Sequence, residues 1–312
     1  MNNSELKRGG PLRGVRVVEF AGLGPAPFAC MLLADMGADV VRIDRPDAPL
    51  IDARDIVNRG RRTVVLDLKA PEDTAQALEL ARCADLLVEG FRPGVMERLG
   101  LGPVAAHALN PSLVYGRMTG WGQDGPLAHA AGHDINYIAL AGALSLIGAP
   151  GGAPVPPLNL VGDYGGGSLY LVMGLLAGLL HARATGQGQV VDAAICDGVL
   201  SLLSNNHTHR MRGLLHDQRG SNMLDGGAPY YTTYETADGR HVAIGPIEPK
   251  FFLALCRELE LPESYASLQN DRSSWRDVDA AIAGALRGQG LARWGRGLEG
   301  SGGCFGAVLT RP

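Results

Sequence analysis

The sequence predicts an α/β fold built on a parallel sheet, followed by a smaller α+β region. In roughly the first 200 residues, short apolar stretches alternate with helix-like segments. The apolar stretches are mostly continuous, as in strands that are buried on both faces of a sheet. The 312 residues are 46% apolar and 19% charged, which is the composition of a globular protein.

The elements expected in the first region follow in chain order. Strand-like stretches lie at 15–20, 39–44, 63–68, 85–89 and 113–117, and helix-like segments at 26–36 and 72–83. Two more helices are expected at 133–146 and 168–184, then a strand at 188–193 and a helix ending near Leu203. We assign these elements to a large Rossmann-like domain over residues 1–204, with helices on both faces of its sheet.

The second region begins with a polar, histidine-containing stretch, residues 205–224, that we interpret as a linker. A hairpin is expected from 230–235 and 241–245, around the turn Ala237-Asp238-Gly239. A helix should cover 249–259, because Pro249 suits a first helical position. Residues 225–312 are therefore predicted to form a small α+β domain, whose pattern weakens in the glycine-rich stretch after Gly288.

Composition also limits the class of partner and the compartment. The net charge of −4 gives no electrostatic reason to expect nucleic acid or an anionic membrane as a partner. Residues 1–10 lack the apolar core of a secretory signal, and the apolar run 169–180 is too short to span a bilayer. The five widely spaced cysteines fit reduced thiols. We therefore expect a soluble, cytoplasmic protein.

A glycine-rich stretch, Gly22-Leu23-Gly24-Pro25-Ala26-Pro27, superficially resembles a dinucleotide fingerprint, with Asp44 at the end of the next strand. However, Pro27 occupies the third glycine position, and Pro25 removes an amide that would face a pyrophosphate. The stretch therefore favours a tight turn from strand to helix over a site for NAD.

Five arginines lie in predicted loops beside the strands: Arg45, Arg61, Arg62, Arg92 and Arg98. Ligands of open α/β sheets bind at the carboxyl ends of the strands, where arginines can hold phosphates through paired hydrogen bonds. For any one of these arginines taken alone, a solvated loop charge is the favoured interpretation.

Two titratable residues precede predicted helices in glycine-rich surroundings. His133 follows Gly132, and Asp163 precedes Gly165-Gly166-Gly167. Both suit ordinary helix starts, but three glycines also let a ligand approach closely, and a helix N-terminus stabilises a carboxylate. Glu248, before Pro249, is either a helix-start acid or a group that orients an imidazole. An acid/base on each side of one carbon is what a reaction that removes and returns a proton needs.

Other kinds of site find no support in the sequence. His207, His209 and His216 have no cysteine or carboxylate partner at a recognised ligand spacing, so we predict no metal. The sequence contains neither the G-x-S-x-G motif of serine hydrolases nor a P-loop.

With these motifs in view, the chain resembles the α-methylacyl-CoA racemases, a group within the family III CoA-transferase superfamily (the CaiB/BaiF type). The resemblance runs from about residue 12 to about residue 265. It is carried by the stretches 14–22, 33–38, 41–46 (Val-Arg-Ile-Asp-Arg-Pro), 91–95 (Phe-Arg-Pro-Gly-Val), 132–137 (Gly-His-Asp-Ile-Asn-Tyr), 224–229 (Leu-Asp-Gly-Gly-Ala-Pro) and 247–249 (Ile-Glu-Pro).

The resemblance implies roles for particular residues. His133 and Asp163 would be the two catalytic acid/bases, and Glu248 would support His133 from the other subunit. The family's fold is an interlocked homodimer in which the active site lies at the subunit interface. The CoA part of the substrate would contact Arg45, Val65, Leu66, Asp67, Leu68, Arg92, Arg98, Gly132, Asp134 and Tyr137.

The implied reaction interconverts (2R)- and (2S)-2-methylacyl-CoA thioesters. The α-hydrogen of a thioester is much less acidic than imidazolium or a carboxylic acid, so the site must stabilise the enolate oxygen with preorganised donors. The backbone amide near Asp134, at a helix start, is a candidate donor. His133 would remove a proton from one face and Asp163 would return one to the other. We expect no metal, redox cofactor or pyridoxal phosphate to be required.

Two alternatives remain open. CoA transferases of this superfamily use an aspartate at the position of Asp163 as a nucleophile, through a mixed anhydride. A CoA-binding protein without activity is the other alternative. His133 in its 132–137 setting separates the activities, because the racemases carry this histidine and the transferases generally do not.

The chain also departs from the family pattern near its end. It stops at Pro312, whereas family members usually continue through a segment that returns to the large domain. The stretch 295–303 matches poorly, so we expect the return segment to be missing. The sequence does not choose among branched fatty acyl, bile-acid and aryl-propionyl groups.

Overall fold

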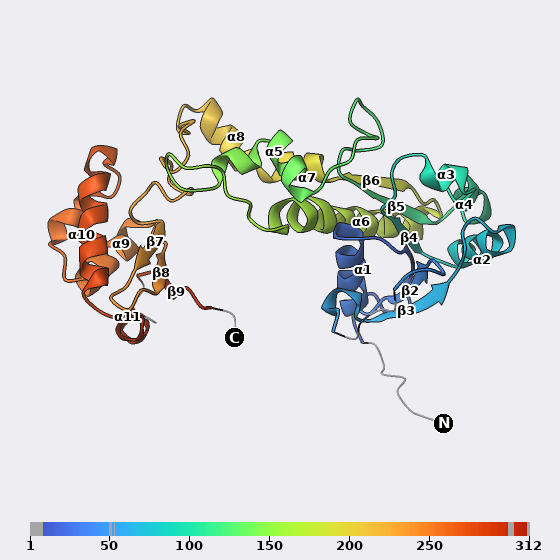
Figure 1. Ribbon diagram of the computed structural model, residues 1–312, viewed down its shortest axis with the longest axis horizontal. Coiled ribbons are helices and arrows are strands. Elements are labelled where there is room, and N and C mark those ends of the chain that lie inside the picture. Colours follow the sequence, from blue (N-terminus) through green and yellow to red (C-terminus); the bar gives the residue numbers. More distant parts are fainter. Residues whose placement is uncertain (1–8, 50–51, 53, 299–302, 311–312) are drawn as a thin grey trace, which may run out of the picture. The chain divides into compact units, whose positions relative to one another are not determined.

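The structure is a computed structural model that describes residues 9–49, 52, 54–298 and 303–310 (Figure 1). It divides into unit 1, Met1–Leu144 and Pro156–Asn205, and unit 2, Ser145–Val155 and Asn206–Pro312. Residues 205–224 were predicted to be a linker, but α8 (Ser204–Met211) covers the start of this stretch. The grouping of Ser145–Val155 with unit 2 was not predicted from the sequence.

The parallel sheet that the sequence predicts is confirmed in unit 1. Six strands pair in the order β3-β2-β1-β4-β5-β6, and every pairing is parallel. The chain builds outward from β1 through β2 to β3, then returns to place β4 on the other side of β1. The strands are β1 (Arg16–Phe20), β2 (Asp39–Asp44), β3 (Arg61–Val65), β4 (Leu86–Glu89), β5 (Val114–Thr119) and β6 (Val190–Ala194).

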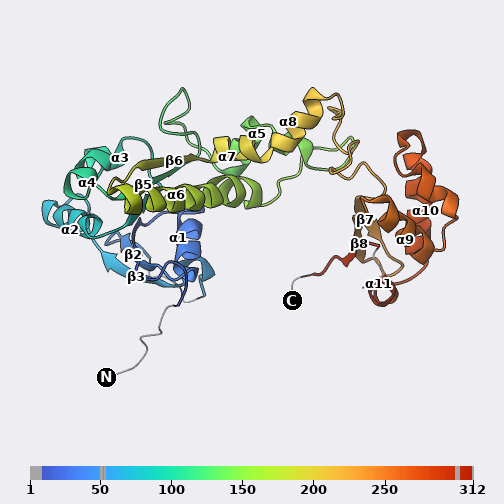
Figure 2. The same ribbon diagram turned by 180° about the vertical axis from the view of Figure 1, so that it is seen from behind.

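Helices cover both faces of this sheet. Successive strand residues point to opposite faces, so Val17 and Leu86 join a core with α1 and α6, whereas Val18 and Leu87 join a core with α2, α3 and α4. Figures 1 and 2 show α6 running along β5 and β6. The helices are α1 (Pro25–Asp35), α2 (Pro71–Arg82), α3 (Val95–Arg98), α4 (Pro103–Leu109), α5 (Asp134–Leu140), α6 (Leu169–Thr185) and α7 (Ile195–Leu202).

Strand β3 lies two residues earlier at its start than the stretch 63–68 that the sequence predicts. Arg61 and Arg62, expected in a loop, belong to the strand and pair with Val40 and Val41 of β2. The strand ends at Val65, although the Leu66 N–H still donates to the Asp44 carbonyl at 2.8 Å. At this edge of the sheet Arg62 lies at the surface, whereas the Arg61 side chain is buried against Glu19.

The helix expected to start at Ser168 begins earlier, in a wide turn. Residues Leu160–Ser168, which we call the π segment, form a π-helix that continues directly into α6. Its hydrogen bonds span five residues, as between the Tyr164 N–H and the Asn159 carbonyl at 3.3 Å. Asp163 therefore lies inside a helical segment and not before a helix start.

The π segment and α6 together form one long apolar helix, Leu160–Thr185, which is long and apolar enough to cross a membrane by length and composition. The helix packs on β5, and Leu171 and Leu175 are fully buried in the unit 1 core. The buried face of this helix therefore belongs to the unit 1 core.

Unit 2 is a small α+β unit with its own core. Strands β7 (Thr232–Glu235) and β8 (His241–Ile244) form the predicted hairpin, and β9 (Phe305–Ala307) pairs antiparallel with β8. The sheet packs on α9 (Pro249–Glu258), α10 (Trp275–Arg287) and α11 (Leu291–Leu298), around side chains such as Phe252 and Ile282. Pro249 starts α9, as the sequence predicts.

Candidate active site

A cavity of about 400 Å³ opens at the carboxyl ends of the unit 1 strands. Its walls come from the segments that follow β1 (Leu23–Ala26) and β4 (Gly90–Pro93), and from the end of β5 (Met118–Trp121). The strand order reverses between β1 and β4, and ligands of open α/β sheets bind at such a switch point. The cavity has the size of a small-molecule site.

His133 enters this cavity from the start of α5. It is the N-cap residue of this helix, as the sequence predicts, and its extended backbone turns the ring toward the cavity. The side-chain oxygen of Asn136 accepts a hydrogen bond from the His133 N–H at 3.0 Å. The imidazole is therefore mounted on a capped helix start, and its side chain is exposed to solvent.

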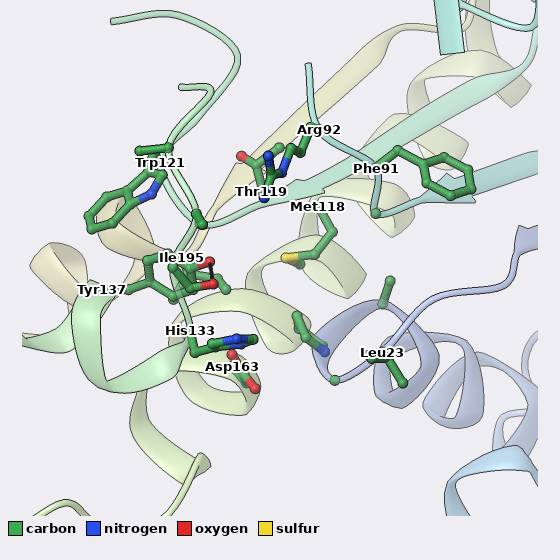
Figure 3. Close-up of a pocket in the computed structure, with 18 of the residues that line it drawn as sticks. Leu23, Phe91, Arg92, Met118, Thr119, Trp121, His133, Tyr137, Asp163 and Ile195 are labelled. Carbon is green, nitrogen blue, oxygen red and sulfur yellow. Dashed lines mark hydrogen bonds between the residues drawn. The ribbon is translucent and has the colours of Figure 1, made fainter. Parts of the chain in front are cut away.

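Asp163 reaches the same cavity from the π segment. Figure 3 shows its carboxyl group beside the His133 ring, and the two groups interact electrostatically. Burial raises the pKa of Asp163, and the charge of Asp134 raises it further. A hydrogen bond from Asn159 and the charge of His133 act in the opposite direction. A carboxyl group with a raised pKa can both give and take a proton near neutral pH more readily than an ordinary aspartate.

Aromatic and basic residues shape the rest of the cavity. The Tyr137 hydroxyl donates to the Gly132 carbonyl, and its ring packs edge-on against Trp121 with centroids 4.8 Å apart. Arg92 lines the cavity near Thr119, as Figure 3 shows. The sequence predicts His133, Asp163, Arg92, Gly132 and Tyr137 as site residues, and all of them line this cavity.

A buried ion network supports the wall that carries Arg92. The Glu89 carboxylate accepts the Phe91 N–H at 2.7 Å and pairs with Arg117 at 3.0 Å, and Arg117 also pairs with Glu97 of α3 at 2.9 Å. Burial raises the pKa of Glu89 to about 7, against the opposing effects of the Phe91 hydrogen bond and Arg117. Sequence inspection missed this network, although a charged residue in each of two otherwise apolar strands was a signal for it.

The remaining residues predicted to contact CoA lie outside the lining of the cavity. Arg45 follows β2 and forms an exposed ion pair with Asp47 at 3.0 Å. Of the Val65–Leu68 stretch, Val65 is exposed and Leu66 is buried, while the Asp67 N–H is held by the Asp73 carboxylate at 2.7 Å. Arg98 ends α3. Since β2, β3 and β4 are parallel, these residues follow strand ends on the same edge of the sheet as the cavity.

The two arginines of β3, Arg61 and Arg62, also have acidic partners. The Arg61 side chain is buried, 2.5 Å from the Glu19 carboxylate, and donates to the Val57 and Pro27 carbonyls. Arg61 was wrongly considered as a phosphate ligand, because its charge is used inside the fold. Arg62 pairs with Asp39 at 2.6 Å on the surface.

Glu248 lies in unit 2, as the exposed N-cap of α9. Its carbonyl accepts the Phe252 N–H at 3.0 Å, which is a normal helix start. Among the described residues, no three histidine, cysteine or acidic side chains form a cluster that could hold a metal ion.

Gly24 gives Asp163 its access to the cavity. Its φ of 70° and ψ of −115° suit glycine alone, and a Cβ at this position would lie 3.1 Å from the Asp163 Oδ2. Gly24→Ala is therefore expected to displace the Asp163 carboxyl group. The kcat of the racemisation that the sequence resemblance implies should fall roughly tenfold to a hundredfold. Steady-state kinetics of the purified variant measures this loss.

Gly186→Ala is the control for backbone strain. Gly186 ends α6 with a φ of 76°, and a Cβ there would meet nothing within 4 Å. Both variants should lose about 1–3 kcal/mol of stability, but only Gly24→Ala should lose kcat. If the two variants had the same kcat, Gly24 would be needed only for the stability of the fold and not for the position of Asp163.

The fold and the cavity define a class of protein. A family model for CoA-transferase family III matches residues 12–311, and the chain belongs to this family. The resemblance inferred from the sequence motifs is thereby confirmed at the level of the family.

Individual relatives show which members of the family the chain resembles. The chain is 44% identical to the α-methylacyl-CoA racemase of Homo sapiens over 299 residues, which cover 96% of this chain and 78% of the relative. It is 43% identical to the racemase of Mus musculus over the same shares. Among solved structures, the Rv3272 protein of Mycobacterium tuberculosis superposes with a TM-score of 0.80 at 30% identity, covering 96% of this chain and 86% of that chain.

Proposed function

We propose that this protein is a racemase that interconverts the (2R) and (2S) forms of 2-methylacyl-CoA thioesters. The observation that carries the proposal is that His133 and Asp163, from two different elements, meet in one cavity at the switch point of the sheet. The names of the human and mouse relatives support the same activity. Two acid/bases in one cavity suit a reaction that removes a proton and returns it.

In the proposed mechanism, neutral His133 takes the α-proton from one enantiomer. The electron pair of the C–H bond moves into the thioester carbonyl and forms an enolate. The protonated Asp163 carboxyl group then delivers a proton to the opposite face of the same carbon, and the reverse direction exchanges the two roles. The Asp134 N–H, in the first turn of α5, lacks an intrahelical partner by position and is the proposed donor to the enolate oxygen.

The proposed CoA site follows the carboxyl ends of β2, β3 and β4. Arg45, Arg92 and Arg98 would hold phosphate oxygens, since guanidinium groups bind phosphates through paired hydrogen bonds. The stretch Val65–Leu68 would line the nucleotide. The proposed chemistry needs no metal or other cofactor, because the thioester itself makes the α-proton acidic.

The assembly is part of the proposal. We infer a homodimer in which Glu248 of one subunit orients His133 of the other, as the resemblance to the racemases implies. We also infer a cytoplasmic location. Cys30, Cys83, Cys196 and Cys256 are free thiols, which suits a reducing compartment.

Deuterium incorporation tests the proposed function. A single enantiomer of a 2-methylacyl-CoA is incubated with the protein in D₂O, and the α-deuterium and the enantiomer ratio are measured. Exchange with racemisation and without an acyl acceptor is expected for a racemase. Transfer of CoA to an added free acid would identify the transferase alternative, with Asp163 as nucleophile. Neither exchange nor transfer would identify a CoA-binding protein without activity.

A further inference from the structure

Asp134 connects the two segments that carry the proposed acid/bases. It is the first residue of α5, directly after His133, and its side chain is only 7% exposed. Its Oδ2 accepts the backbone N–H of Asp163 at 2.7 Å. The Asp134 carboxylate therefore joins the start of α5 to the π segment at Asp163, one of the two proposed acid/bases.

The π segment is shaped to admit this carboxylate. A Cβ at Gly162 would overlap the Asp134 Oδ2, would lie 2.7 Å from its Cγ and would press on Ile138. Only glycine at position 162 lets the backbone pass close enough for the Asp163 N–H to reach Asp134. The contact is therefore built into both segments.

The second oxygen of Asp134 is not explained by this hydrogen bond. Oδ1 is buried and has no hydrogen-bond partner among the described residues. Leaving a buried polar atom unpaired costs about 1–3 kcal/mol. A neutral asparagine would accept the Asp163 N–H equally well, so the hydrogen bond alone does not account for the negative charge.

The charge acts on Asp163. From α5, Asp134 raises the pKa of Asp163 and His133 lowers it, after the larger effect of burial. Within its own stretch of chain, Asn159 lowers the pKa of Asp163 through a hydrogen bond. Helix α1 also packs on the π segment. Its N-cap residue, Gly24, lies next to the Asp163 carboxyl group and carries no charge.

Two further groups lie in the neighbouring elements. The π segment packs on α7, which carries the thiol of Cys196 and the exposed carboxylate of Asp197. Neither residue shifts the pKa of Asp163. The charges of Asp163, Cys196 and Arg92 act instead on the pKa of Tyr137. Among the described groups, Asp134 is the one negative charge that acts on Asp163.

We propose that Asp134 is a positioning residue: its carboxylate fixes Asp163 beside His133 and places a negative charge behind the Asp163 carboxyl group. The role of Asp134 in catalysis rests on the racemase function proposed above. Its effect on Asp163 does not, and the two are tested separately.

The test is Asp134→Asn, which keeps an acceptor for the Asp163 N–H and removes the charge. The pKa of Asp163 should then fall, because the neighbouring negative charge that raises it is gone. In the direction in which Asp163 removes the α-proton, its carboxyl group must be ionised. The rate in this direction is therefore lost as pH falls through the pKa of Asp163. This acidic limb of the pH–rate profile should move to lower pH in the variant. In the opposite direction Asp163 must be protonated, so a lower pKa should also lower kcat at neutral pH. KM should stay unchanged.

Asp85→Asn is the matched control. The Asp85 Oδ2 also accepts a distant backbone N–H, that of Arg16 at 2.7 Å, but it lies before β4 at the other edge of the sheet. This variant should leave the pH profile and kcat unchanged. Asp134→Ala, which removes the acceptor as well as the charge, should lower kcat more than Asp134→Asn.

A second measurement does not depend on activity. The ¹³C-carboxyl resonance of Asp163, assigned with Asp163→Asn, is titrated in the wild-type protein and in Asp134→Asn. A lower midpoint in the variant supports the proposal; an unchanged or higher midpoint overturns it. Absence of racemisation in the wild-type protein would reject the proposed function, and the titration would still decide the inference. Should Asp134→Asn fail to fold, Asp134→Ser removes the same charge and is titrated in its place.

Discussion

His133→Ala is expected to lower kcat for racemisation by about 10²–10⁴-fold, the usual contribution of a positioned acid/base. The variant should nevertheless retain deuterium exchange with one enantiomer. Asp163 can still remove the proton on its own side and return a solvent-derived proton to the same face. Asp163→Ala should show the complementary behaviour, with exchange confined to the other enantiomer.

Mass spectrometry combined with chiral separation of the hydrolysed acyl groups measures both effects. His181→Ala is the control, because His181 is an exposed histidine on α6 that does not line the cavity. It should behave as the wild-type protein. Undiminished racemisation in His133→Ala, or exchange of both enantiomers at the wild-type rate, would remove His133 from the mechanism.

Arg61→Ala is expected to destabilise the protein by about 3–5 kcal/mol, because it leaves the Glu19 carboxylate buried without its partner. Burial raises the pKa of Glu19 to about 7, while Arg61 and Arg42 oppose this effect. The folded state therefore binds the Glu19 proton more tightly than the unfolded state does, and this group's contribution to stability falls as pH rises between 4.5 and about 7. Without Arg61 the pKa of Glu19 should rise further, so the loss should be larger at pH 8 than at pH 5.

Urea unfolding at the two pH values measures this loss. Arg62→Ala, one residue away, removes an exposed ion pair with Asp39 and should cost less than about 1 kcal/mol. Similar losses in the two variants would mean that the buried pair contributes no more than the exposed one.

The sheet could be predicted from the sequence because local patterns specify it. Continuous apolar stretches identified all six strands, and the segments between them identified α1, α2, α5, α6 and α7. The short helices α3 and α4, on the same face of the sheet as α2, were not predicted. The start of β3 was misplaced because Arg61 resembles a loop charge when read locally. Its partner Glu19 lies 42 positions away in sequence, and only the pairing of β1, β2 and β3 brings the two together.

The candidate site was partly predictable for the same reason. His133 lies at a helix start because Asn136 caps that start locally. The π segment could not be predicted, because the three glycines read as a helix breaker. In the structure they allow close packing instead: a Cβ at Gly166 would lie 2.7 Å from the Val199 side chain and 2.9 Å from the Ile195 carbonyl, both of α7. The contact between Asp134 and Asp163 spans 29 positions and likewise depends on tertiary structure.

The orientation of Asp163 relative to α6 depends on the number of residues between them, because the π segment continues directly into α6. Successive residues are rotated by about 100° in an α-helix and by somewhat less in the wider π-helix. The loss of one residue between Asp163 and Ser168 would therefore turn either the carboxyl group or the apolar face of α6 away from its target. Substitutions alter a site in small steps, but this relation is disrupted in one step, by a change of length. Length in this short stretch should therefore vary far less among functional descendants than the side chains around it.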